Sequence, residues 1–389
     1  MLSRRFLLKS AAMAACSAAA HPLMSTITFA SVPGDNRLVV IVLRGAMDGL
    51  DVVQPYGDPG LRALRRSLSP GPDQGAIDLD GFYALHPALS PLLPLWQAGE
   101  LGFAHAVATP YRDKRSHFDG QDVLEAGSGN DVPVDVRRGG WLNRLLQAMP
   151  GVQAETAYSV GSEQMLILSG QARALSWAPD ARLALSAQAQ LLLDAVYHDD
   201  PLFREAAADA AEIGLDLGSD GRSRGQTGVR LARFAADRLN GETRIAAFSL
   251  SGWDTHARQG AVLGRTLGGL AETILALKER LGPNWGRTTV LALTEFGRTA
   301  RENGSAGTDH GTGGAMLMAG GAVRGGRVHA DWPGLADDAL YQQRDLMPTR
   351  DVRAYAGWAM RGLFGTAPGL IEDTIFPGLD LGPDPRILR

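Results

Sequence analysis

The chain has 389 residues, of which 45% are hydrophobic, and its formal net charge at pH 7 is -4. A chain of this size can bury a large core, and the slight negative charge argues against nucleic acid as a partner. The single cysteine, Cys16, excludes both a disulfide framework within the chain and a metal cluster built on cysteine.

Residues 1–30 have the pattern of a twin-arginine export signal. Arg4 and Arg5 precede an apolar, alanine-rich run over residues 11–20, which is too short to span a bilayer. We therefore predict the twin-arginine export machinery as a partner and a periplasmic or secreted location. In an alternative processing route, cleavage as a lipoprotein leaves a lipid anchor on Cys16. Residues 31–389 show no linker, internal repeat or later transmembrane segment, and we expect them to form a single domain.

Strands and helices alternate along the rest of the chain. Runs of β-branched and apolar residues predict strands, and apolar residues at helical spacing predict helices. The expected strands cover residues 38–43, 101–108, 156–160, 244–250, 288–293 and 315–319. The expected helices cover residues 85–97, 141–149, 185–196, 227–239, 259–281 and 349–364. This order predicts an α/β fold with a mostly parallel central sheet, and we expect a basic run at 62–66 and a loop at 215–226 to face solvent.

The first predicted strand leads directly into a carboxylate flanked by glycines, Asp48. A carboxylate at the tip of a strand can hold a cation, and it can equally cap the helix that follows. The sequence leaves both interpretations of Asp48 open. His86, which precedes Pro87, has the position of a structural helix cap, and a ligand role is the alternative.

Residues 111–122 combine cations, carboxylates, a serine and a histidine at an expected helix start. Basic side chains near a helix N-terminus bind anions, so Arg115 is a candidate anion ligand and Ser116 a candidate nucleophile. The alternative is a charged capping segment in which Ser116 is the N-cap.

Acidic residues and histidines follow the later strands at a similar structural position. Asp254 and His256 are two residues apart after the strand 244–250, so both should project to the same side of an extended segment. The other acidic residues and histidines of this kind are Glu295, Asp309 and His310. The carboxyl ends of parallel strands meet at one edge of a sheet, the usual place for a ligand site. We therefore expect these groups to share a metal site with the first-strand carboxylate.

Seven segments together resemble a bacterial family known as domain of unknown function 1501, whose members are often exported by the twin-arginine route. They cover residues 44–49, 85–89, 116–118, 254–256, 295–299, 308–311 and 325–327, in order along nearly the whole chain after the leader. That family is similar in turn to the alkaline phosphatase and sulfatase superfamily. The resemblance implies a three-layer α/β/α sandwich with a divalent metal centre, usually of two zinc ions.

The superfamily resemblance also implies roles for the residues at the strand ends. The implied metal ligands are Asp48, Asp254 with His256, Glu295 and His310, and Ser116 matches the nucleophile at a helix start. The chain departs from the superfamily because Asp254 and His256 are two apart instead of four, and because Phe296 stands where a histidine normally follows the carboxylate. Either Arg298 or His117 would compensate for that histidine, and a single metal ion or a non-catalytic protein stays open.

The predicted activity is metal-assisted hydrolysis of a phosphate or sulfate ester, with an anionic small-molecule ester as the substrate. The predicted metal ligands are Asp48, His117, Asp254, His256, Glu295, Asp309 and His310. The predicted metal is zinc, with calcium, manganese or magnesium as alternatives. Ser116 or a water attacks the ester, while Arg115 and Arg298 hold the anion. The competing predictions are a non-catalytic exported binding or assembly protein on a degenerate hydrolase scaffold, and a purely structural role for the loop residues.

Overall fold

The computed structural model describes residues 27–31, 34–68, 70–112, 114–129, 139–149, 159–160, 165–172, 175–177 and 226–389. Residues 1–26 of the predicted export signal, Cys16 among them, lie outside the described residues, whereas its last residues, 27–30, belong to a strand. The predicted helix 185–196 and the predicted loop up to residue 225 also lie outside the described residues.

The centre of the fold is a set of three parallel strands with continuous apolar sequence. They are β2 (Arg37–Arg44), β9 (Thr243–Ser251) and β10 (Thr288–Thr294). β2 lies between β9 and β10 and runs in the same direction as both. Val39 and Ile41 of β2 face one core, and Val40 and Val42 face the other, so both faces of the strand are buried. The predicted α/β class and the mostly parallel central sheet are confirmed.

The sheet extends on both sides of this parallel centre. The further strands are β1 (Ile27–Ser31), β6 (Leu101–Ala108), β7 (Ser159–Val160), β8 (Leu175–Trp177), β11 (Gly314–Ala319), β12 (Val328–His329) and β13 (Arg350–Asp351). Beyond β10 follow β11, β6 and β12, with β13 also paired to β6, and beyond β9 follow β1, β8 and β7. β11 runs antiparallel to β10 because the chain returns through a loop instead of a crossover helix. A small second sheet consists of β3 (Val53–Gln54), β4 (Ile77–Asp78) and β5 (Ala84–Leu85).

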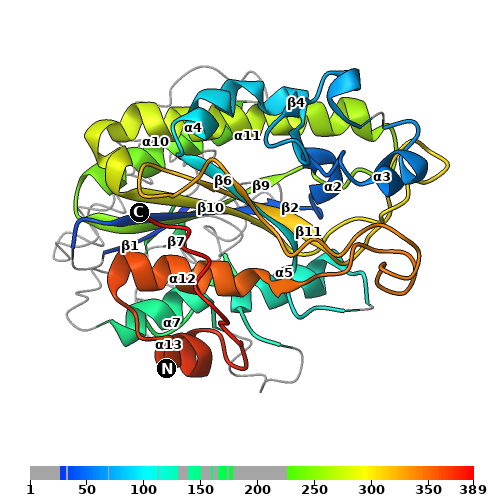
Figure 1. The fold of residues 1–389 in the computed structure, drawn as a ribbon. Helices are drawn as coiled ribbons and strands as arrows, with labels where there is room; N and C mark the ends of the chain where they lie inside the picture. The colour runs from blue at the N-terminus through cyan, green and yellow to red at the C-terminus, as the bar shows by residue number, and fades with distance from the viewer. Residues whose placement is uncertain are drawn as a thin grey trace, which may run out of the picture.

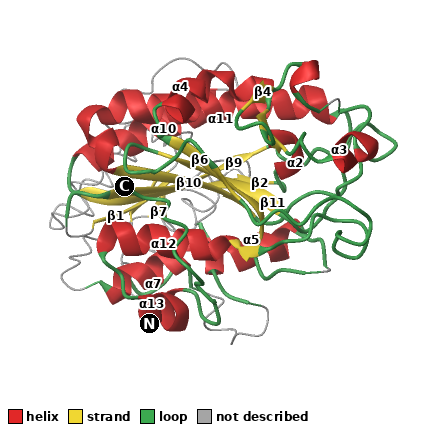
Figure 2. Ribbon diagram, viewed as in Figure 1, coloured by secondary structure: helices red, strands yellow, loops and turns green. Residues whose placement is uncertain are grey.

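Helices cover both faces of the central sheet (Figures 1 and 2). One face carries α4 (Leu93–Gln97), α10 (Gln226–Asn240) and α11 (Gln259–Leu281). The other face carries α5 (His117–Ala126), α7 (Trp141–Ala148), α12 (Val352–Phe364) and α13 (Pro368–Leu370). The short elements are α2 (Gly49–Val52), α3 (Pro59–Leu64), the 3-10 turns η1 (Pro72–Gln74), η2 (Pro87–Leu92), η3 (Leu166–Leu168) and η4 (Gly282–Arg287), and the π-helical turn η5 (Ile371–Ile375).

The predicted α-helix 85–97 is wrong over its first half, which forms η2. Pro91 and Pro94 lack an N–H and cannot donate the hydrogen bonds of a regular α-helix, so only Leu93–Gln97 is α-helical. His86 caps η2 as predicted, because its Nδ1 accepts a hydrogen bond of 3.1 Å from the N–H of Ala88.

Within the described residues, one helical stretch, Gln259–Arg287, is long and apolar enough to cross a membrane by length and composition. It consists of α11 and the turn η4. The side chains of Leu267, Leu270 and Ile274 are buried in the core that α11 shares with α10 and the sheet. A buried core helix meets the same criteria, and α11 packs as one.

The carboxyl ends of β2, β9 and β10 meet at one edge of the sheet, since the three strands are paired in register to their last residues. The loops that leave these ends cover residues 45–48, 252–258 and 295–313. They touch backbone to backbone: a Cβ added to Gly45 would lie 2.6 Å from the backbone nitrogen of Asp254, and one added to Gly307 would lie 2.4 Å from the backbone of His256. The loops that carry the predicted ligands are therefore packed together at this edge.

Candidate metal centre

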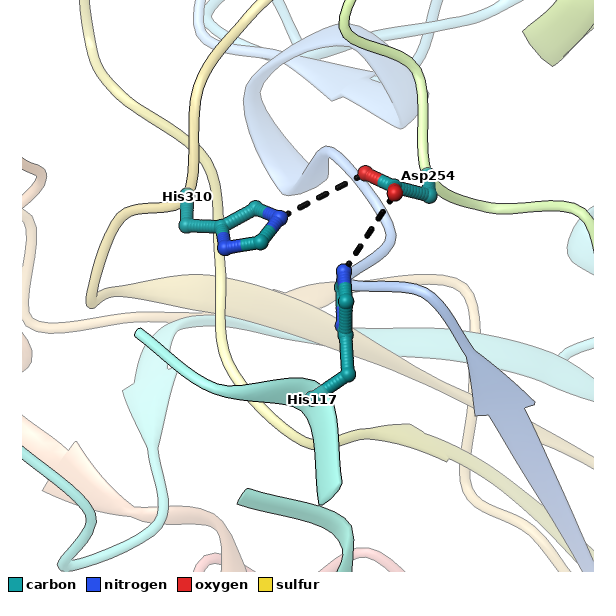
Figure 3. Close-up of side chains that lie close together, drawn as sticks. All are labelled: His117, Asp254 and His310. Atoms are coloured by element: carbon teal, nitrogen blue, oxygen red, sulfur yellow. Dashed lines mark ion pairs between the residues drawn. The ribbon is translucent and has the colours of Figure 1, made fainter. Parts of the chain in front are cut away.

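Three side chains from separate segments converge at the carboxyl edge of the sheet (Figure 3). Asp254 follows β9, His310 lies in the loop between β10 and β11, and His117 begins α5. The carboxylate lies between the two imidazoles: Oδ2 of Asp254 is 3.5 Å from Nε2 of His117, and Oδ1 is 3.5 Å from Nε2 of His310. One ligand atom of each residue lies within 4.8 Å of the others, so a single metal ion can contact all three.

His256 adds a third imidazole to this group. Its Nε2 is 3.0 Å from Nε2 of His310 and 3.1 Å from Oδ1 of Asp254. Asp254 and His256 thus reach the same place, as their spacing of two residues predicts. Two imidazole nitrogens at 3.0 Å need a proton or a cation between them, because two lone pairs would repel. We call His117, Asp254, His256 and His310 the histidine–aspartate cluster.

The second ring nitrogen of each histidine fixes its tautomer. Each Nδ1 faces an oxygen that can only accept a hydrogen bond, so each Nδ1 carries the hydrogen and donates it. The acceptors are Oε1 of Glu295 for His117 at 2.7 Å, Oδ1 of Asp309 for His256 at 3.1 Å, and the backbone oxygen of Arg115 for His310 at 2.8 Å. In the neutral imidazole each Nε2 then keeps its lone pair, the form in which a histidine binds a metal.

The carboxylates around the cluster are held in their ionised form. Burial raises the pKa of Glu295, but hydrogen bonds from His117 and from backbone N–H groups outweigh it and hold the pKa below its usual range. In the same way, the charge and hydrogen bond of Arg298 outweigh burial and lower the pKa of Asp254. Hydrogen bonds from Asn303 and His256 lower the pKa of Asp309. These acids therefore stay negative at neutral pH and favour a cation in their midst.

Phe296 occupies the position for which the superfamily resemblance predicts a histidine, and it packs against His117. The two rings are stacked with centroids 5.2 Å apart and an angle of 20° between their planes. Gly120 leaves the space for this contact, since a Cβ there would lie 2.9 Å from the Phe296 ring. The bond to Glu295 raises the pKa of His117 against the effect of burial and holds the ring from its other nitrogen. Of the two predicted compensations, His117 is the one that brings an imidazole into the cluster.

The cluster fits a divalent ion in its donor atoms and in its spacing. Nε2 of His117 is buried and has no hydrogen-bond partner among the described residues. A buried polar atom without a partner is costly unless something binds it. Zinc ligands in tetrahedral geometry lie about 3.4 Å apart. The separations in the cluster are 3.0, 3.1, 3.5 and 3.5 Å, so these residues can hold one ion.

Asp48, predicted as a metal ligand, takes no part in the cluster. Its Oδ2 accepts hydrogen bonds from Arg65 and from Gln259, both at 2.6 Å. Its Oδ1 accepts from Arg65 at 3.0 Å and from the N–H of Leu50 at 3.2 Å. These four bonds use the lone pairs of the carboxylate, and the bond from Leu50 makes Asp48 the N-cap of α2.

Arg65 and Gln259 are buried polar residues that were not predicted to take part in the site. Arg65 is 1% exposed, so the predicted solvent exposure of the basic run is wrong at this residue. Leu61, Leu64 and Arg65 follow the i, i+3, i+4 spacing of a buried helix face, which is the signal that identifies it. Gln259 has no such signal, because an amide at a helix start is ordinarily exposed.

Arg298, predicted to hold the substrate anion, has a structural place instead. Its side chain is 0% exposed. Its guanidinium donates to the backbone oxygens of Gly45, Ala46, Trp253 and Thr308 and to Oδ1 of Asp254. It therefore ties together the loops after all three central strands and presents no accessible face to a substrate.

Ser116 and Arg115 lie at the start of α5, beside the cluster. Ser116 is the N-cap of α5, since its Oγ accepts from the N–H of Asp119 at 3.4 Å, which matches the alternative interpretation. Arg115 contributes its backbone oxygen to His310, while its side chain is exposed. Its φ of 53° is uncommon for a residue other than glycine, and this conformation places the carbonyl in the site.

The protein is thus an α/β protein with a histidine–aspartate cluster at the carboxyl edge of its central strands. A sequence model of the family described as "Protein of unknown function (DUF1501)" matches residues 102–357, more than half of the chain, and the chain belongs to this family. The matched part contains the whole cluster and leaves out Asp48 and Arg65. No curated protein and no solved structure matches the chain.

Proposed function

We propose that this protein is an exported metal-dependent hydrolase of phosphate or sulfate esters, built on a three-layer α/β/α sandwich of the alkaline phosphatase type. The observation that carries the proposal is the convergence of three imidazole Nε2 lone pairs on Asp254, with every Nδ1 held by an acceptor. A divalent ion held there would offset negative charge on the ester oxygens and promote attack by water or a hydroxyl.

The donor set favours particular metals. Calcium and magnesium prefer oxygen ligands throughout, whereas three imidazole nitrogens with one carboxylate suit zinc or manganese. His117, Asp254, His256 and His310 would hold the ion. Glu295, together with Asp309 and the Arg115 carbonyl, would orient the imidazoles from behind.

A cavity of about 220 Å³ beside the cluster would receive the substrate. Asp309 lines it and also bonds His256, so the cavity adjoins the proposed metal site. Arg301 and Arg344 lie in the same wall. The side chain of Arg301 is exposed and makes no hydrogen bond or ion pair with the described residues, which leaves its guanidinium available to an anion. In this proposal Arg301 and Arg344 take the anion-binding role predicted for Arg298.

The catalytic proposal is tested on protein exported by its own leader. We expect elemental analysis to find a transition metal, and aryl phosphate or aryl sulfate to be hydrolysed. His310→Ala should lose the metal and at least about 100-fold in kcat/KM. His86→Asn is the control, because asparagine retains the capping role outside the cluster. Metal-loaded protein without turnover on a broad panel of both ester types would refute the hydrolase.

The export proposal rests on Arg4 and Arg5 ahead of the apolar run. A reporter fused behind residues 1–30 should reach the periplasm, and replacing both arginines by lysine should keep it in the cytoplasm. Unchanged export of the doubly substituted fusion would exclude the twin-arginine route.

A non-catalytic exported binding or assembly protein is the second candidate. Two observations favour it. Ser116, the predicted nucleophile, is the N-cap of a helix, and the guanidinium of Arg298, the predicted anion ligand, is buried. On this alternative the protein binds its metal ion with the same residues and shows no turnover, and His310→Ala weakens only metal binding. The ester panel therefore separates the two candidates.

A further inference from the structure

A second group of polar side chains, three of them charged, is buried and hydrogen-bonded to the loops that carry the histidine–aspartate cluster. Asp48 and Asp51 of the segment around α2, Arg65 after α3, and Gln259 at the start of α11 are each at most 4% exposed. We call these four residues the buried charge group. α2 and α3 lie together at the same side of the molecule as the end of β2 (Figure 1).

Two carboxylates of this group share a single hydrogen-bond donor. Nε2 of Gln259 donates to Oδ2 of Asp48 at 2.6 Å and to Oδ2 of Asp51 at 2.9 Å, so the two oxygens share one donor. Two buried carboxylates this close repel each other unless a cation or a proton lies between them. This pair would therefore be a second metal site if nothing else supplied the positive charge.

Arg65 supplies that charge. Its Nη1 and Nη2 bond the two oxygens of Asp48 at 2.6 and 3.0 Å, a bidentate pair. The same guanidinium donates to the backbone oxygens of Thr299 and Ala300, in the loop after β10, at 2.9 and 3.0 Å. It thus joins the α2 segment to the loop that carries His310, as a metal ion bridging both would.

The guanidinium of Arg65 balances one of the two carboxylate charges of the group. Arg65 carries one positive charge against two carboxylates, and burial together with Asp48 raises the pKa of Asp51. The raised pKa shows that a second negative charge is disfavoured in this group, and Asp51 is held by hydrogen bonds from the amides of Gln54 and Gln259. In the histidine–aspartate cluster, by contrast, Nε2 of His117 is buried and finds no hydrogen-bond partner in the part of the chain that the structure describes.

Gln259 connects the buried charge group to the proposed metal ligands. Its Oε1 accepts hydrogen bonds from Oγ1 of Thr255 at 3.0 Å and from Oγ1 of Thr308 at 2.6 Å. Thr255 stands between Asp254 and His256, and Thr308 directly precedes Asp309 and His310. One amide therefore fixes both segments that carry ligands.

We propose that the guanidinium of Arg65 takes the place of a second divalent cation, so that the centre binds one metal ion, and that Gln259 is a positioning residue that couples this charge pair to the ligand-bearing loops. The inference rests on the metal centre of the proposed function. The superfamily resemblance implies two metal ions. In this inference the centre holds one ion, and the guanidinium of Arg65 takes the place of the second.

Metal stoichiometry tests the first part without reference to turnover. Zinc and manganese are titrated into the purified protein and counted by elemental analysis after gel filtration. The wild-type chain should retain one ion. Arg65→Ala opens the space next to Asp48 and should bind a second ion, with a melting temperature that rises on adding manganese. Asp48→Asn with Arg65→Met removes both charges together, and this control should retain one ion.

Metal affinity tests the second part. Gln259→Leu should bind zinc about 10-fold more weakly with unchanged stoichiometry. Gln54→Leu is the matched control, because Gln54 also bonds Asp51, at 3.2 Å, but touches neither threonine. It should bind zinc as the wild type does. Equal affinities of Gln259→Leu and Gln54→Leu would refute the positioning role.

The outcomes separate this inference from the proposed function. Two ions on the wild type, or one ion on folded Arg65→Ala without a manganese response, would overturn the role of Arg65. If Arg65→Ala does not fold, the wild-type count still decides between one ion and two. One ion without ester turnover would refute the hydrolase and leave the inference standing, whereas no ion at all would remove the metal centre on which both depend.

Discussion

Replacing Glu295 by glutamine tests how the proposed metal centre is held together. Glu295 is 0% exposed and accepts hydrogen bonds from Nδ1 of His117 at 2.7 Å, from the N–H of Gly45 at 2.9 Å and from Oγ1 of Thr294 at 2.9 Å. Glutamine has the same shape, and its amide can donate to the Thr294 hydroxyl, so the fold should persist. The lost charge makes His117 a poorer donor of its lone pair and leaves its tautomer less strictly fixed.

The expected effect is a loss in metal affinity. Carboxylates that hold a ligating histidine contribute about 10–100-fold in affinity, or about 1.4–2.7 kcal/mol. Competition with a chromogenic chelator measures the zinc dissociation constant of Glu295→Gln and of the wild type. Glu302→Gln is the matched control, since that carboxylate bonds Ser67 and Leu68, away from the histidines. A dissociation constant of Glu295→Gln within twofold of the wild type would show that the bond to His117 does not support metal binding.

Three further predictions concern stability and the cap of α5. Arg298→Met leaves several buried backbone oxygens and Asp254 without their donor, and it should lower the free energy of unfolding, measured in urea, by about 3–5 kcal/mol. Arg301→Met is the control at an exposed arginine and should change this free energy by less than about 0.5 kcal/mol. Similar values for both variants would contradict the structural role of Arg298. Burial lowers the pKa of His105 to about 4, so the unfolded chain, with a pKa of about 6.5, takes up the proton first as the pH falls. Stability should therefore fall by about 3 kcal/mol between pH 6.5 and pH 4, and this part of the slope should be absent in His105→Gln; an unchanged slope would refute the assignment. Ser116→Ala should cost about 1 kcal/mol through loss of the N-cap and leave ester turnover near the wild-type rate, and a loss of turnover of 100-fold or more would make Ser116 the nucleophile after all.

The sequence alone predicted the parts of the molecule that depend on local pattern. The sequence predicted β2, β6, β9, β10 and β11, because a strand buried on both faces is a continuous run of apolar and β-branched residues. The spacing of Asp254 and His256 gave their common direction, because side chains alternate along an extended segment whatever surrounds it. The edge of the sheet followed from the parallel order of the strands.

The local sequence pattern did not predict which distant residues would form hydrogen bonds or ion pairs with one another. Nothing near Asp48 distinguishes a metal ligand from the partner of Arg65, and nothing near Arg298 tells an anion-binding side chain from one that donates to buried carbonyls. The role of each residue depends on which loops pack together at the edge of the sheet and on which side chain then lies within hydrogen-bond distance of a given oxygen.

Chain order and periodicity determined the fold class, the strand ends and the set of acids and histidines that this protein places there. The tertiary structure decided which of them share a site, which tautomer each histidine adopts and which cation neutralises each carboxylate. The physical reason is range: the periodicity of burial is a property of neighbouring residues, whereas a hydrogen bond or ion pair between residues such as Asp48 and Gln259, 211 positions apart, exists only once the loops have packed.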